Sequence, residues 1–115
     1  MSLWVKVFLN ILYAIITLLL VILLWNNTAI LIVFLLLVGV GMYFISPTPT
    51  SLFVYIISFV IGPLAESAAI YYGIWTYTNP AIIGLPLWLP FAWANCGLCI
   101  KNTVDLSQEI LTINK

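Results

Sequence analysis

Apolar residues fill most of the chain in four long runs, which short polar breaks separate. The runs cover residues 3–25, 29–45, 51–73 and 80–100. The breaks read NNT, SPTPT and WTYTN, and their asparagines and prolines are typical of turns. A helix that crosses a bilayer needs about 20 predominantly apolar residues, which each run approaches or exceeds. The pattern therefore predicts an all-α integral membrane bundle of four transmembrane helices.

The fourth run differs from the others because its first half is rich in helix breakers: Pro80, Gly84, Pro86 and Pro90. Asn79 is a candidate N-cap and Pro80 a candidate first helical residue, so we expect a helix over 80–100. The same breakers leave open an irregular or re-entrant start, which a membrane tolerates only where protein or water covers the backbone.

Residues 101–115 follow the fourth run as a polar tail. Leu106, Ile110 and Ile113 recur at helical spacing in it. We expect residues 1–100 to form the transmembrane domain. The tail is expected to be cytoplasmic, as a short amphipathic helix on the inner surface or docked to a partner.

The third run contains two features that affect helix packing. Pro63 removes one backbone hydrogen bond after Gly62, so we expect the helix to kink at this pair. Small residues then recur every fourth position, which permits close approach of a second helix; they are Ala65, Ala69 and Gly73. Gly39 and Gly41 in the second run are expected to serve similarly.

Composition supports the membrane assignment. Of the 115 residues, 65% are apolar and 5% are charged, far below the roughly 25% charged residues of soluble domains. The formal net charge is zero, with three lysines and no arginine. No basic stripe is available for phosphate backbones, which excludes nucleic acid as a partner.

The lysines also predict the orientation. Lys6 lies near the start of the first run, and Lys101 and Lys115 follow the fourth. An even number of crossings places both termini on one side, and the positive-inside rule makes that side cytoplasmic. We expect a prokaryotic inner membrane protein. Its first run exceeds the apolar core of a signal peptide, so we expect a permanent helix there.

Glu66 is the one carboxylate inside an apolar run. It lies four residues beyond the middle of its run at Gly62, which is about 6 Å along a helix. An ionised carboxylate at such depth costs roughly 2.5 to 3.5 kcal/mol, and no Lys or Arg lies at that level. We expect Glu66 to face the bundle, to be neutral and to donate a hydrogen bond. Thr17, at a similar depth, is the expected partner.

Polar residues line one face of the first and fourth runs. In the first run they are Lys6, Asn10, Tyr13 and Thr17, and in the fourth the face holds Trp88, Ala92, Asn95 and Cys99. The depth estimate places Asn95 near the level of Asn10. The simplest interpretation is interhelical hydrogen bonding, worth about 0.6 kcal/mol for each bond. Glu66 is different, because intramembrane carboxylates are functional by default.

Metal and cofactor chemistry has little support in the sequence. Cys96 and Cys99 form a C-x2-C pair, but two thiols in a chain without histidine do not complete a tetrahedral zinc site. We expect both to behave as small buried apolar residues. The sequence contains no nucleophile and base pair and no glycine-rich phosphate loop, so we expect neither a metal nor a cofactor.

One resemblance adds to this interpretation. The order Glu66, GIWTY at 73–77, GLP at 84–86 and Trp93 resembles the core pattern of membrane carotenoid hydratases of the bacterioruberin type and, more loosely, of membrane lycopene cyclases. The stretch LPLWLPFAWAN is also similar to the last helices of small multi-helix inner-membrane proteins. Together these stretches cover about 35 residues. The resemblance implies that Glu66 is the acid that protonates a polyene and that Trp75, Tyr77 and Trp93 line its pocket.

Two classes of function remain. The first is a non-catalytic subunit that packs within a larger membrane complex or a homo-oligomer, which we favour because one carboxylate supplies little catalytic machinery. The alternative is a binding protein or enzyme for an apolar isoprenoid or lipid, with Glu66 as its intramembrane acid. The candidate ligand-binding residues are Thr17, Trp75, Tyr77, Trp88, Trp93 and Asn95.

Overall fold

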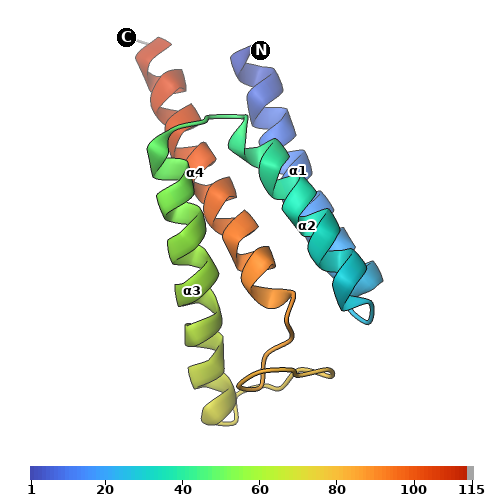
Figure 1. The fold of residues 1–115 in the computed structure, drawn as a ribbon. Helices are drawn as coiled ribbons and strands as arrows, with labels where there is room; N and C mark the ends of the chain where they lie inside the picture. Colours follow the sequence, from blue (N-terminus) through green and yellow to red (C-terminus); the bar gives the residue numbers. More distant parts are fainter. Residues whose placement is uncertain (114–115) are drawn as a thin grey trace.

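The computed structural model describes residues 1–113 and consists of four helices (Figure 1). They are α1 (Leu3–Leu24), α2 (Thr28–Tyr43), α3 (Pro49–Tyr71) and α4 (Leu89–Ile113). Within this part of the chain there is no strand, only an isolated antiparallel bridge between Ile82 and Leu85. The all-α prediction is confirmed.

Helix α4 is the centre of the fold, because it packs against each of the other three helices. α1 and α2 also pack on one another, whereas the main partner of α3 is α4. Figure 1 shows α3 on one side of α4 and the α1–α2 pair on the other. The start of α1 and the end of α4 lie at one end of the bundle, and residues 72–88 lie at the opposite end.

Local signals place the first three helices within two residues of their expected bounds. The Ser2 side chain caps α1 by accepting from the Val5 amide at 3.3 Å. A capping box between Thr48 and Ser51 starts α3, with proline in its first turn. Such caps satisfy backbone donors that lack partners inside the helix. α3 continues through Pro63 to Tyr71, and the kink at this proline stays a prediction.

The expected bounds of the fourth helix are wrong at both ends. α4 starts at Leu89 and not at residue 80, and it continues to Ile113 where a separate tail was expected. Residues 80–88 are irregular because Ile83 and Gly84 have φ angles of 47° and 81°, a left-handed conformation that a helix cannot contain. The alternative of an irregular start describes this segment correctly.

The distribution of side chains differs from that in a water-soluble protein, although ten apolar side chains among residues 1–113 also form a buried core. Large apolar side chains are exposed along all four helices, while the buried polar residues are Asn10, Thr17, Ser51, Asn95, Lys101 and Asn102. α1 and α3 are long and apolar enough to cross a membrane, and α2 is apolar but shorter, with 16 residues. These features support association with a membrane.

Small residues allow close packing at some of the expected positions only. A Cβ on Gly39 would lie 2.8 Å from Asn95 Oδ1, and one on Gly41 would lie 2.8 Å from the Tyr13 ring. The row in α3 behaves differently: Ala65 is exposed, and a Cβ on Gly73 would meet nothing within 4 Å. The glycines of α2 therefore pack within the chain, and the α3 row does not.

Candidate functional site

A cavity of about 570 Å³ lies between α1, α3 and the start of α4. Its lining residues come from α1, α3, the 72–88 segment and α4: Ala14, Thr17, Leu18, Val21, Glu66, Trp75, Tyr77, Trp88, Leu89, Ala92, Trp93 and Cys96. Six of the seven residues selected from the sequence are among them. The seventh, Asn95, lies elsewhere.

Glu66 holds together three parts of the chain at this cavity. The Tyr77 hydroxyl donates a hydrogen bond to its Oε1, and the Trp93 indole nitrogen donates one to its Oε2. Glu66 itself is half-buried on α3. The expected partner was wrong, because Thr17 lines the same cavity but accepts its hydrogen bond from Asn95. Glu66 also accepts two bonds where we expected it to donate one.

Tyr77 lies in the irregular segment, outside the four helices. Burial, and then the hydrogen bond to Glu66 and its charge, raise the pKa of Tyr77 far above the ordinary value of a phenol. Its hydroxyl therefore keeps its proton and remains a donor to Glu66. The Tyr77 ring also meets Trp88 edge to face, with 6.1 Å between ring centroids.

Gly62 explains how Trp93 reaches the carboxyl group. A Cβ on Gly62 would lie 2.2 Å from Cδ2 of Trp93, so only glycine lets the indole ring lie directly against α3. Residues four apart lie on the same face of a helix, which places Glu66 next to the indole nitrogen. The kink expected at Gly62 and Pro63 does not include this role. The spacing of four between Gly62 and Glu66 was the available signal for it.

Asn95 lies deeper, at 0% exposure. Its Nδ2 donates to the Leu35 carbonyl at 3.0 Å and to Thr17 Oγ1 at 3.4 Å, while its Oδ1 has no hydrogen-bond partner among residues 1–113. Asn95 lines a second cavity of about 240 Å³. Ala14, Thr17 and Cys96 line both cavities, so the two adjoin.

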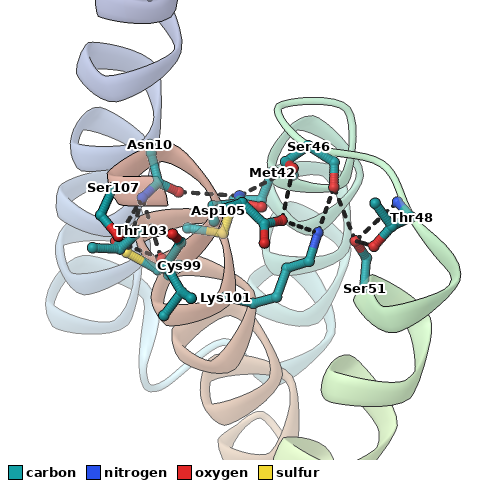
Figure 2. A network of polar contacts seen from close by, with 12 residues as sticks. Asn10, Met42, Ser46, Thr48, Ser51, Cys99, Lys101, Thr103, Asp105 and Ser107 are labelled. Atoms are coloured by element: carbon teal, nitrogen blue, oxygen red, sulfur yellow. Dashed lines mark hydrogen bonds and ion pairs between the residues drawn. The ribbon is translucent and has the colours of Figure 1, made fainter. Parts of the chain in front are cut away.

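A polar network ties the helices together nearer the chain termini (Figure 2). Asn102 Nδ2 donates to Asn10 Oδ1 at 3.1 Å and to the Met42 carbonyl at 3.0 Å. Asn10 in turn donates to Thr103 Oγ1 at 3.1 Å. The expected level of Asn95 beside Asn10 is therefore wrong. Asn102, about two helical turns further along α4, takes that place.

Lys101 lies inside the bundle, at 7% exposure, although we expected it outside the last helix. Its Nζ lies 2.6 Å from Asp105 Oδ2 and donates to the Ser46 carbonyl at 2.6 Å. Ser46 Oγ donates to the same Asp105 oxygen at 2.8 Å, as Figure 2 shows. These bonds compensate both charges and attach α4 to the turn between α2 and α3.

Both cysteines are free thiols, but the expectation that both are buried is wrong: Cys96 is exposed at the edge of the two cavities, and Cys99 is half-buried. In the part of the chain that the structure describes, no group of three or more His, Cys, Asp or Glu side chains could hold a metal ion. The chemistry available at the cavity is therefore that of one carboxyl group, a phenol, a thiol, an alcohol and several indoles.

Comparison of the chain with protein-family models, with curated proteins and with solved structures found no match. The resemblance to carotenoid hydratases and lycopene cyclases therefore stays a prediction. What the protein does has to be inferred from the cavity and its residues.

Proposed function

We propose that this protein is a small integral membrane protein that crosses the bilayer four times and binds an apolar isoprenoid or lipid in the Glu66 cavity. One observation supports this most: a cavity lined by apolar and aromatic side chains contains one carboxyl group, which Tyr77 and Trp93 hold in position. Binding sites for small molecules have this composition, with a mostly apolar wall and few oriented polar groups.

Helix lengths support four crossings. At 1.5 Å per residue, α1 and α3 measure about 33 and 34 Å, against a hydrocarbon core of about 30 Å. α4 measures about 37 Å and is less apolar than α1 and α3, and its buried Lys101 is paired with Asp105. α2 measures about 24 Å and is short, which a bilayer accommodates by local thinning. The start of α1 and the end of α4 lie at one end of the bundle, which supports a common cytoplasmic location of the termini.

The position of the cavity supports entry from the lipid phase. α3 packs mainly on α4, so the space between α3 and α1 is not closed by a helix contact of comparable extent. Leu18 of α1 lines the cavity and is 61% exposed, and Trp93 and Trp75 are also exposed. In a bilayer these exposed surfaces face acyl chains, so an apolar molecule reaches Glu66 without crossing water.

Binding is favoured over catalysis by the same residue set. Protonation of a polyene by Glu66 would leave a carbocation, and the proton that the carbocation or an added water later releases has to return to Glu66 before it can act again. Glu66 is the one carboxyl group that lines the cavity. An enzymatic role therefore requires Glu66 to act both as acid and as acceptor of the returning proton, whereas binding requires no proton transfer.

The experiment is native mass spectrometry of the protein after extraction in a mild uncharged detergent. We expect about one apolar molecule per chain to be retained, given a cavity of this size. A protein that repeatedly appears as the bare chain, while its fold is intact by circular dichroism, would contradict the proposal.

A role as a packing subunit is the second candidate, and one observation favours it. Ala65 is exposed on α3 and Ala69 is only half-buried, so this small-residue row has no helix packed over it within the chain. Such rows promote association of transmembrane helices. Ala65→Leu should lower the oligomeric mass in mild detergent, and Ala29→Leu, at an exposed position on α2, should not. A wild-type monomer with no co-purifying protein speaks against this role.

A further inference from the structure

We infer that the polar end of the bound molecule is an organic cation, a quaternary ammonium or a protonated amine, attached to an apolar body. This inference rests on the proposed function and names the ligand class of the same cavity. It follows from three properties of the site: the carboxyl group of Glu66 with its two donors, the aromatic residues around it and the apolar remainder of the lining.

The first property is a carboxyl group that receives two hydrogen bonds and is paired with no described lysine. Both hydrogen bonds to Glu66 come from neutral donors, the Tyr77 hydroxyl and the Trp93 indole. A carboxylate with two such donors has the hydrogen bonds that its ionised form requires. Inside a bilayer such a carboxylate is normally paired with a positive charge.

The described lysines are too far along their helices to supply that charge. Lys6 precedes Thr17 of the cavity by eleven residues, or about 16 Å along α1. Lys101 follows Trp93 by eight residues, or about 12 Å along α4, and is paired with Asp105. Lys115 lies outside the described residues. The structure therefore leaves the positive charge to the ligand.

The second property is the aromatic lining around the carboxyl group. Trp75, Tyr77, Trp88 and Trp93 all line the cavity together with Glu66. Aromatic faces attract cations, tryptophan most strongly, and groups of such rings are the usual recognition device for quaternary ammonium groups. A neutral apolar molecule needs neither the carboxyl group nor so many indoles, and an anion would be repelled by Glu66.

The third property is the apolar part of the lining, which fits a chain attached to the cation. Ala14, Leu18, Val21 and Leu89 line the same cavity on its α1 and α4 sides. The adjoining cavity extends this lining toward Cys99 and Ile100. A cation at Glu66 could therefore extend an alkyl or isoprenoid chain along the α1–α4 contact.

The test compares two probes of equal shape in uncharged maltoside micelles. One is decyltrimethylammonium, and the other is its neutral isostere, in which a quaternary carbon replaces the nitrogen. Trp75, Trp88 and Trp93 line the cavity, so tryptophan emission reports binding once partition into empty micelles is subtracted. We expect the cation to bind at least about tenfold more tightly than the isostere.

Two variants assign the difference to Glu66. Glu66→Gln keeps the shape of the side chain and removes the charge, so it should abolish the preference for the cation. Glu109→Gln removes a carboxylate from an exposed position of α4 outside the cavity and should leave the preference unchanged. If Glu66→Gln fails to fold, the comparison of the two probes on the wild type still shows whether the cavity prefers a cation.

The outcomes separate this inference from the proposed function. Equal affinity of the wild type for the two probes overturns the cation and leaves the cavity as a site for neutral apolar molecules. A preference for the cation that Glu66→Gln retains overturns the assignment to Glu66. Failure of both probes to bind the folded wild type overturns the inference and the proposed function together.

Discussion

The indole ring of Trp93 lies directly on Gly62, so close that a Cβ on Gly62 would be 2.2 Å from Trp93 Cδ2. This contact joins α4 to α3 and places the Trp93 nitrogen at Glu66 Oε2. Because Gly62 has no side chain, its backbone lets the Trp93 ring of α4 lie close to α3 and beside Glu66. The carboxyl group then has its second bond from Tyr77 in the irregular segment.

Gly62→Ala should displace the Trp93 ring and break its hydrogen bond to Glu66. We expect a loss of about 1 to 3 kcal/mol, typical of an added methyl group in a tightly packed place. Thermal unfolding in detergent measures this loss of stability. Combination with Trp93→Leu provides the control, because removal of the ring removes the clash. Strictly additive effects of the two substitutions would contradict the contact.

Tyr77→Phe should remove one of the two donors to Glu66 while keeping the ring against Trp88. We expect a loss of stability of about 1 kcal/mol, the net value of a typical hydrogen bond. Tyr71→Phe is the matched control, since Tyr71 is 83% exposed. Equal melting temperatures of the two variants would show that the Tyr77 hydroxyl contributes nothing.

Sequence patterns could predict the helices that strong local signals delimit. Runs of apolar residues with polar turns between them predicted the bounds of α1, α2 and α3 to within two residues. An acid inside an apolar run singled out Glu66, and the resemblance to membrane carotenoid hydratases implied Trp75, Tyr77 and Trp93; these residues line one cavity. Composition and spacing sufficed for the first three helices and for Glu66, because a membrane environment restricts where polar groups can lie.

The start of α4 and the partners of Glu66 could not be predicted in this way. The φ angles at Ile83 and Gly84 delay the helix to Leu89, and no periodicity in the sequence encodes that delay. Because the helix starts later than expected, the depth estimated for Asn95 is wrong. Asn102, and not Asn95, is the partner of Asn10. The bond from Trp93 to Glu66 depends on the crossing of α3 and α4, which is a tertiary property.

Asn102→Ala should weaken the attachment of α4 to α1 and α2. It removes the donor to Asn10 Oδ1 and to the Met42 carbonyl, both at a buried position. We expect a loss of about 1 kcal/mol, as for interhelical hydrogen bonds in membranes. Asn26→Ala, in the exposed turn after α1, is the control. A melting temperature for Asn102→Ala equal to that of the control would contradict the role of the network.

The four crossings and their orientation predict the signals of topology reporters. Fusions at Asn27 and at Asn79 should report the outer side of the membrane, and a fusion after Lys115 should report the cytoplasm. Asn79 belongs to the 72–88 segment, at the end of the bundle opposite the start of α1 and the end of α4. The same signal from Asn27 and Lys115 is incompatible with the four-crossing arrangement.

The central claim is that the Glu66 cavity holds an apolar molecule, and filling the cavity tests it most directly. Ala14 lines both adjoining cavities, so Ala14→Phe should fill space that the ligand needs. Ala29→Phe adds the same ring at an exposed position of α2 outside both cavities. Native mass spectrometry should detect the retained molecule on the wild type and on Ala29→Phe, and at least about tenfold less of it on Ala14→Phe. Equal retention by folded Ala14→Phe and Ala29→Phe would contradict the account, because the molecule would then be bound elsewhere on the protein.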